Sequence, residues 1–372
     1  MLLSYCTNVH PAEDLDGILR QLDAYAVPVR ERLGQDRLGV GLWLAAEVAA
    51  GLAADRESRR RLAAELSARG LVVQTLNAFP YGGFHADVVK HAVYVPKWTD
   101  AARLRYTLDC VTVLADLLPA DAAYGSISTL PLGWREPWGP SHDLRAGIAF
   151  EEVTRVLRTA LARHEQPIRL AVEPEPGCVL DTVADAVTWL ADRVEPEYVG
   201  LCLDTCHLAV SFADPAETVA RIRAAGLDVV KVQASAALHV EDPGTEDARA
   251  ALAEFAEPRY LHQVRELTGT GDVLAADDLP EALDRLPARG PWRVHFHVPL
   301  HASPEPPLTS TTGVLRDAVA ALAEGGGPLP HVEVETYTWN VLPAAQRQDL
   351  ADGIADELRW ARARLLSQEV RT

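Results

Sequence analysis

"VGLCLDTCHLAV", residues 199–210, begins as an apolar run and then presents Asp204, Cys206 and His207 within four positions. The apolar half has the composition of a strand in a parallel sheet, which is buried on both faces. The carboxylate and the imidazole follow directly, so they belong to the carboxyl end of that strand. Proteins with parallel sheets gather their functional groups at this end. The stretch therefore predicts both an α/β fold and a functional site.

The same pattern recurs along the whole chain, where short apolar runs alternate with longer amphipathic stretches. The predicted strands are 2–8, 37–44, 71–79, 123–131, 168–176, 198–206, 228–235, 292–300 and 331–339. The predicted helices are 12–33, 46–69, 100–118, 145–165, 180–193, 214–225 and 344–366. Gly70 and Gly226 are predicted C-terminal helix stops. This alternation predicts one (β/α)8 TIM barrel spanning residues 1–372.

Nine predicted strands are one more than an eight-stranded barrel needs. Residues 236–290 break the rhythm with short helix patterns and the turn "TGTGD", so we interpret them as an inserted segment after the seventh strand. Either 292–300 or 331–339 closes the barrel. We favour 331–339, with 292–300 beside the insertion or at the mouth of the barrel.

Composition excludes several classes of partner. The chain has 372 residues and a formal net charge of −18. Nucleic acids and anionic membranes bind through clustered Lys and Arg, so neither is an expected partner. No apolar run reaches the roughly 18 residues of a membrane span, and the first residues lack the pattern of a signal peptide. Five scattered cysteines do not form a disulfide framework. We therefore expect a cytoplasmic protein.

Other predicted strands also end in polar residues. Buried carboxylates on apolar strands need compensating charge, and a divalent cation provides it. Carboxylates combined with imidazoles or an amide suit Mg²⁺, Mn²⁺ or Zn²⁺. The residues at these ends are Glu173 and Glu175 at the fifth strand, Gln233 at the seventh, His295, His297 and His301 in "HFHVPLH" at and just after the end of 292–300, and Glu333 and Glu335 in 331–339.

Several of the polar residues at the strand ends also have a purely structural interpretation. Asp204 has the position of a helix N-cap. His207 is equally consistent with a structural histidine. Glu173 and Glu335 could instead pair with Lys231 or an arginine inside the barrel. Cys206 is adjacent to His207, but a free buried cysteine is far commoner than a ligand or a nucleophile.

The strand ends resemble a known superfamily. A glutamate at the fifth strand, "LDTCH" at the sixth, a polar residue at the seventh and "EVET" at the eighth are similar to the xylose isomerase-like barrels. This group includes sugar isomerases, sugar epimerases and endonuclease IV. The resemblance implies that Glu173, Asp204 and Glu335 bind the metal, with His207 at or beside it. It also implies that Glu173 and Glu335 act as acid and base.

One position departs from that pattern. The epimerases have histidine at the seventh strand, where this chain has Gln233. Glutamine coordinates metals more weakly and cannot act as a base. Either His297 completes the ligand set, or the metal is bound loosely or not at all.

Longer strings carry a closer resemblance. "SYCTNVHP", "FPYGGFH", "GSISTLPLGW", "VEPEPG", "YLHQV", "HFHVPLH" and "EVETYTW" resemble the EboE family of metabolite traffic proteins. That family belongs to bacterial gene clusters implicated in moving or making a small secondary metabolite. The resemblance implies a small-molecule substrate and, as further partners, other proteins of the same pathway.

These observations lead to one function and two alternatives. The expected function is a metal-dependent isomerase or epimerase that transfers a proton next to a carbonyl of a sugar, cyclitol or related polyhydroxy metabolite. A barrel that binds a metabolite without catalysis is the first alternative. A metal-dependent phosphodiesterase resembling endonuclease IV is the second, which the acidic charge and Gln233 disfavour.

Further residues are expected to contact the substrate. The predicted substrate-binding residues are Asn8, His10, Asn77, His85 and Lys231, of which Lys231 could equally be a counter-ion of the buried glutamates. The segment 77–98 is too long and too aromatic for a plain connection and is a candidate lid. Its rings, Phe84, His85, His91, Tyr94 and Trp98, are expected either to cover the substrate or to pack on the barrel rim.

Overall fold

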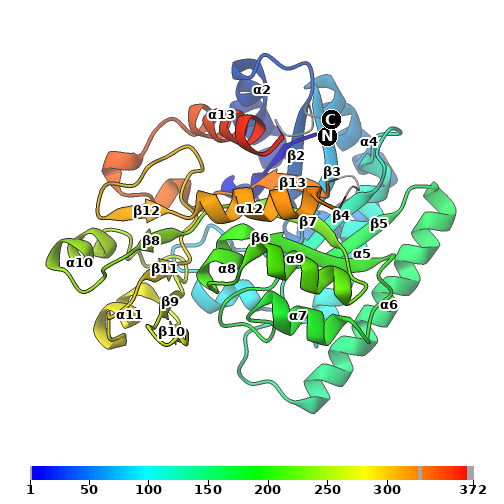
Figure 1. Cartoon of the computed structure of the whole chain (residues 1–372). Coiled ribbons are helices and arrows are strands. Elements are labelled where there is room, and N and C mark those ends of the chain that lie inside the picture. Colours follow the sequence, from blue (N-terminus) through cyan, green and yellow to red (C-terminus); the bar gives the residue numbers. More distant parts are fainter. Residues whose placement is uncertain (1, 326–328, 367–372) are drawn as a thin grey trace.

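A closed barrel of eight parallel strands forms the centre of the computed structural model, which describes residues 2–325 and 329–366 (Figure 1). The order around the barrel is β1-β13-β7-β6-β5-β4-β3-β2. The strands are β1 (Ser4–Cys6), β2 (Leu38–Trp43), β3 (Leu71–Asn77), β4 (Gly125–Thr129), β5 (Ile168–Val172), β6 (Val199–Asp204), β7 (Val229–Ala234) and β13 (His331–Val334). The predicted barrel is confirmed, and the last strand candidate closes it.

Helices surround the barrel and bury their apolar faces against it. They are α1 (Leu15–Gln21), α2 (Val27–Arg32), α3 (Ala46–Ala54), α4 (Arg56–Ala68), α5 (Ala101–Leu117), α6 (Pro140–His164), α7 (Val183–Leu190), α8 (Thr205–Val210), α9 (Pro215–Ala224), α12 (Thr312–Ala323) and α13 (Leu350–Ala361). Shorter turns of helix are η1 (Thr7–Val9), η2 (Leu22–Ala26), η3 (Lys90–Tyr94), η4 (Tyr337–Val341), η5 (Ala344–Gln346) and η6 (Arg362–Leu366). Among the described residues, no helix combines the length and apolar composition needed to cross a bilayer.

Two helix boundaries show how local sequence determines these elements. Gly70 and Gly226 end α4 and α9 with φ angles of +65° and +71°, the left-handed conformation that glycine adopts at least cost. The predicted helix 46–69 is divided in two, because the Asp55 side chain accepts hydrogen bonds from the backbone of Glu57 and Ser58 and starts α4.

A second, five-stranded antiparallel sheet lies beside the barrel, and we call it the accessory sheet. Its order is β10-β9-β11-β8-β12. The strands are β8 (Leu238–Val240), β9 (Val264–Leu267), β10 (Val273–Ala276), β11 (Trp292–Val294) and β12 (Leu308–Ser310), accompanied by α10 (Glu246–Ala253) and α11 (Leu279–Arg285). Figure 1 shows it on the opposite side of the barrel from α6. Its strands span residues 238–310, a longer segment than the predicted insertion at 236–290.

The predicted strand 292–300 is only partly a strand. Regular pairing stops at Val294, where the Phe296 N–H donates to the carbonyl of Val294 instead of to a neighbouring strand. Residues 295–299 continue without regular structure. This change of direction carries His295 and His297 to the mouth of the barrel.

Inside the barrel, a buried ion pair takes the place of apolar packing. Lys231 Nζ lies 2.8 Å from Glu333 Oε2, and both side chains are fully buried. A Cβ atom at Gly41 on β2 would lie 2.0 Å from Glu333 Oε1, so only glycine leaves room for this carboxylate. Burial alone would lower the pKa of Lys231, but the Glu333 carboxylate raises it.

Candidate active site

Three carboxylates meet at the carboxyl ends of the barrel strands. Glu173 follows β5, Asp204 ends β6 and Glu335 follows β13. None is more than 4% exposed. One oxygen of each lies within 4.8 Å of the others. The barrel topology thus collects acids that are far apart in the sequence.

Asp204 combines a structural contact with a free ligand atom. Its Oδ1 accepts from the His207 backbone N–H at 2.9 Å, which caps α8, and from Ser235 Oγ at 2.8 Å. Its Oδ2 has no hydrogen-bond partner among the described residues. The N-cap interpretation is therefore correct for one oxygen and leaves the other available.

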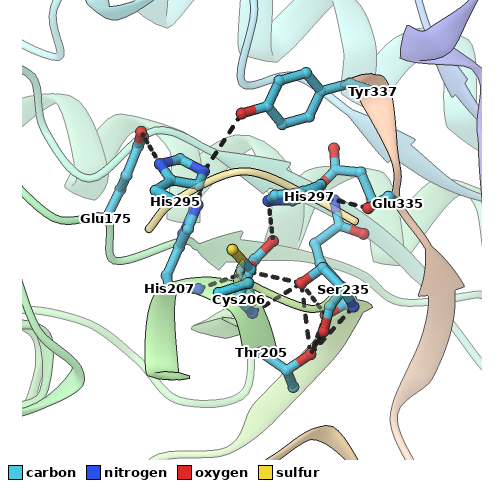
Figure 2. Close-up of polar contacts among 12 residues, drawn as sticks. Glu175, Thr205, Cys206, His207, Ser235, His295, His297, Glu335 and Tyr337 are labelled. Carbon is cyan, nitrogen blue, oxygen red and sulfur yellow. Dashed lines mark hydrogen bonds and ion pairs between the residues drawn. The ribbon is translucent and has the colours of Figure 1, made fainter. Parts of the chain in front are cut away.

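Gln233 and His297 lie beside these acids. Gln233 is fully buried on β7, and neither of its amide atoms has a partner within the described part of the chain. His297 Nδ1 donates to the backbone carbonyl of Glu335 at 2.7 Å (Figure 2), so the lone pair of the ring is on Nε2. This Nε2 lies 3.7 Å from Asp204 Oδ2. Burial lowers the pKa of His297 to about 4, which keeps the ring neutral and able to bind a metal.

The electrostatics of the acids favour the binding of a cation. Burial, reinforced by the neighbouring carboxylates, raises the pKa of both Glu173 and Glu335 well above the ordinary value. Burial opposes ionisation of Asp204 as well, yet His207 and His297 lower its pKa. A divalent cation would relieve the repulsion among these acids and let all three ionise.

The donor set fits a divalent metal ion. The buried atoms without a hydrogen-bond partner among residues 2–325 and 329–366 include one potential ligand atom from each of four site residues: Glu173 Oε2, Asp204 Oδ2, Gln233 Oε1 and His297 Nε2. Buried polar atoms in folded proteins are nearly always satisfied, so their concentration here indicates a ligand. Carboxylate oxygens with one imidazole and one amide are suitable for Mn²⁺, Zn²⁺ or Mg²⁺.

A second group of polar side chains forms the opposite wall of the site. Glu175 accepts from Tyr94 Oη at 2.6 Å and from Gln263 Nε2 at 3.2 Å. His295 Nδ1 contacts Gln263 Oε1 at 2.6 Å, and His295 Nε2 lies 3.1 Å from His207 Nε2. Both Gln263 and His295 come from the accessory sheet and its connections, so the insertion contributes directly to the site.

One pocket lies against part of this site, and its empty space, counted with the open solvent at its mouth, is about 520 Å³. Its polar lining includes Glu173, Glu175, His207, His295, His297 and Glu335, whereas Asp204, Gln233 and Gln263 are not lining residues. The entrance is mainly aromatic, with Phe79, Phe84, Tyr94, Tyr260 and Tyr337 among the lining residues. Three of these rings, Phe79, Phe84 and Tyr94, come from the candidate lid 77–98. Trp98 from the same segment packs instead against Phe150 in the core, with ring centroids 4.5 Å apart.

The predicted substrate-binding residues are divided between the pocket and the core. Asn8 and Asn77 line the pocket and donate from Nδ2 to Glu335 Oε1 at 2.7 Å and 2.8 Å. His85 is half-buried, with Nε2 2.6 Å from the Asn8 carbonyl, and is not a lining residue. His10 is buried against Tyr5 and Tyr25.

Lys231 and His301 also lie away from the pocket lining. Lys231 is held by Glu333, the counter-ion arrangement that the sequence left open. His301 stacks on Trp339 and contacts Gln348. Of the three histidines in 292–301, the pocket therefore receives His295 and His297.

Sequence reasoning missed Gln263 and Tyr337 as site residues, and it named Tyr94 only as a ring of the candidate lid. Tyr94 and Gln263 lie in connections, where strand periodicity gives no information. Tyr337 follows Glu335 by two positions, and the alternation of a strand end could have indicated that both point the same way. Glu175 and His295 were noted at strand ends but were not assigned a role.

The comparisons with known proteins agree with this architecture. The profile described as "Xylose isomerase-like TIM barrel" matches residues 39–299. The chain belongs to this family. The comparison with curated proteins found no match to this chain.

Solved structures share the fold of this xylose isomerase-like barrel at low sequence identity. D-allulose 3-epimerase from Methylomonas sp., in complex with D-allulose, is 13% identical, with 98% of this chain and 97% of that chain covered and a TM-score of 0.52. D-psicose 3-epimerase with D-tagatose from Clostridium cellulolyticum H10 is 14% identical over 98% and 99%, with a TM-score of 0.53. An IOLI protein with a zinc atom is 13% identical over 100% of both chains, with a TM-score of 0.50.

Proposed function

We propose that this xylose isomerase-like barrel is a metal-dependent epimerase or isomerase. It acts on a sugar, cyclitol or related polyhydroxy metabolite by transferring a proton next to a carbonyl. The observation that carries the proposal is the meeting of Glu173, Asp204 and Glu335 within 4.8 Å of one another, beside a pocket that Glu173 and Glu335 line. Glu173 Oε2 and Asp204 Oδ2 have no hydrogen-bond partner among the described residues.

The proposed metal ligands are Glu173, Asp204 and Glu335, with His297 and Gln233 completing the set and His207 beside them. Gln233 alone would be a weak replacement for a histidine. The lone pair of His297 Nε2 faces Asp204, so this histidine from the accessory-sheet side supplies the imidazole that β7 lacks. A divalent cation bound here would polarise the carbonyl and the adjacent hydroxyl of the substrate, which acidifies the neighbouring C–H.

The two glutamates have different surroundings, and this difference suggests their roles. Asn8 and Asn77 both donate to Glu335 Oε1, which favours the ionised form and fixes its orientation. Glu335 is therefore the proposed base. Glu173 Oε2 has no such donor among the described residues. Glu173 is therefore proposed to hold the proton, on the carboxyl oxygen that does not bind the metal, and to return it to the other face of the carbon.

The pocket walls would position a polyhydroxy substrate. Asn8 Oδ1 is buried without a partner within the described residues and can accept from a substrate hydroxyl. The aromatic entrance can stack on the apolar face of a ring and exclude water from the reacting carbon. The titles of the epimerase structures name small sugars, which supports this substrate class.

We also propose a more specific family assignment within the xylose isomerase-like barrels, namely the EboE family of metabolite traffic proteins. Several of the strings that carry this resemblance supply pocket residues, among them Phe79 and Phe84, Tyr260, and Glu335 with Tyr337. The metabolite would then be an intermediate of a secondary pathway, with other proteins of that pathway as partners. Gln233 favours one alternative, a barrel that binds such a metabolite without catalysis, because glutamine is a poor ligand and no base.

The proposed chemistry predicts exchange of a substrate hydrogen with solvent. Ketoses and cyclic polyhydroxy ketones are incubated in D₂O with Mn²⁺, and deuterium at the carbon next to the carbonyl is followed by NMR. We expect Glu173→Gln and Glu335→Gln to reduce exchange by about 10²- to 10⁴-fold. Glu241→Gln, at a side chain that is 84% exposed, is the matched control and should exchange normally. Exchange at the wild-type rate in both pocket variants would contradict the proposal.

A further inference from the structure

Glu335, the proposed base, is oriented by two asparagines that are held in place in different ways. Asn8 and Asn77 both donate from Nδ2 to Glu335 Oε1, at 2.7 Å and 2.8 Å. Asn77 Oδ1 also accepts from the Phe79 backbone N–H at 3.0 Å, so both ends of this amide are anchored. Asn8 Oδ1 has no partner among the described residues. The direction of the Asn8 side chain therefore depends on how its backbone is held.

A histidine that is distant in the sequence holds the backbone of Asn8. His85 Nε2 lies 2.6 Å from the Asn8 carbonyl oxygen. A carbonyl oxygen can only accept, so Nε2 carries the hydrogen and His85 is the donor. Burial lowers the pKa of His85, which favours the neutral ring with its single N–H. His85 does not line the pocket, but it contacts the residue that contacts Glu335.

His85 belongs to the tip of the candidate lid, residues 82–88, and this tip is docked on two other segments of the chain. The Gly83 N–H donates to both carboxylate oxygens of Glu13, at 2.9 Å and 3.1 Å. The Phe84 carbonyl accepts from Tyr260 Oη at 3.2 Å, and the Phe84 side chain lines the pocket. These contacts on either side of His85 determine where its ring lies. The docked tip thus covers part of the pocket and reaches Asn8 at the same time.

We propose that His85 is a positioning residue through which docking of the lid tip orients Glu335. The contacts run from the His85 ring to the Asn8 backbone, and from the Asn8 side chain to the carboxylate. Without His85, Glu335 keeps the donor on Asn77 and loses the precise placement of the donor on Asn8. The base is then fully oriented only while the lid covers the pocket, which couples proton transfer to the exclusion of water.

The inference rests on the proposed function for the role of Glu335 as the base. The contacts between the lid tip, Asn8 and Glu335 do not depend on that role, so they can be tested without a substrate.

Selective ¹⁵N labelling of asparagine is such a test, because the chain contains only Asn8, Asn77 and Asn340. The spectrum should show three side-chain amides, with Asn8 assigned by its absence in Asn8→Ala. In His85→Ala the Asn8 signal should shift, and its hydrogens should exchange with water about 10-fold faster because the amide loses its acceptor. The Asn77 signal should change much less, since the backbone of β3 and its extension hold that side chain.

Two further variants show whether the histidine contact itself is responsible. His85→Gln keeps a side-chain N–H donor, and its Asn8 signal should resemble that of the wild type. Asp87→Ala, at an exposed position of the same tip, is the matched control and should leave all three signals unchanged. Circular dichroism establishes that each variant is folded.

A double-mutant cycle in the deuterium-exchange assay tests the effect on the reaction. His85→Ala should reduce exchange about 10-fold in the wild-type background. In the Asn8→Ala background the same change should cost less than about 2-fold, because the contact through which His85 acts is already lost. His85→Gln should retain most of the wild-type rate.

The outcomes distinguish this inference from the proposed function. An Asn8 signal that is the same in His85→Ala and the wild type would overturn the inference, and so would equal losses of exchange in the two backgrounds. A changed Asn8 signal in a protein that exchanges no substrate hydrogen would overturn the proposed function and leave the positioning of Asn8 by His85 standing.

Discussion

At the scale of single residues, Asn8 is the most informative partner of the proposed base. It donates to Glu335 Oε1 at 2.7 Å, and this hydrogen bond stabilises the ionised carboxylate. Removing it in Asn8→Ala should raise the pKa of Glu335, so the pH at which activity is half-maximal should rise by about one unit. Rate against pH is the measurement, with Asn340→Ala at an exposed amide as the control.

A purely structural role for Asn8 would give a different result. Activity would then fall equally at all pH values, because fewer molecules would be folded. An unchanged midpoint in Asn8→Ala, with normal folding, would show that the hydrogen bond does not tune Glu335.

Some residues of the site could be predicted from the sequence, and others could not. Glu173, Asp204 and Glu335 were predictable because each follows an apolar run, and parallel strands bring such positions to one edge. The contact between Gln263 and Tyr94 was not predictable. The two residues are hydrogen-bonded across 169 positions of sequence, both outside regular strands, and no periodicity relates them.

At the scale of elements, Glu357 links α13 to the loop after β13. Its carboxylate accepts from Leu300 N, Thr336 Oγ1 and Trp339 Nε1. Burial raises its pKa from 4.5 to about 7. Between these values the folded protein keeps a proton that the unfolded chain has released, so stability should fall as pH rises through this window.

The variant Glu357→Gln isolates this effect. Between about pH 5 and about pH 8, the wild type should lose about 2.5 kcal/mol of unfolding free energy relative to the variant, measured by urea denaturation. Asp356→Asn, at the exposed neighbouring acid, should behave like the wild type. The same pH dependence in Glu357→Gln and the wild type would show that this carboxyl is not the titrating group.

The elements also differ in how well sequence predicts them. β6 is six residues long and wholly buried, so its apolar run was unmistakable. β8, β11 and β12 contain three residues each, too few for an alternating pattern to emerge. The antiparallel pairing of β8 with both β11 and β12 depends on contacts across the insertion, which local sequence does not encode.

At the scale of the whole molecule, the barrel and the accessory sheet divide the site between them. The barrel contributes the carboxylates, and the accessory sheet with its connections contributes His295, His297 and Gln263. A net charge of −18 disfavours nucleic acid and favours cations near the surface. The proposed function therefore depends on a cation bound where the barrel meets the accessory sheet and its connections.

The metal content of Asp204→Asn tests this claim most directly. Asparagine preserves the α8 cap, since it is as good an N-cap as aspartate, but it removes the ligand charge. Protein purified without a histidine tag is analysed for Mn, Zn and Mg beside the wild type and Asp121→Asn, an exposed control. We predict at least one ion per chain in the wild type and the control, and about one fewer in Asp204→Asn. Equal metal content in Asp204→Asn and the wild type, or no metal in either, would contradict the account.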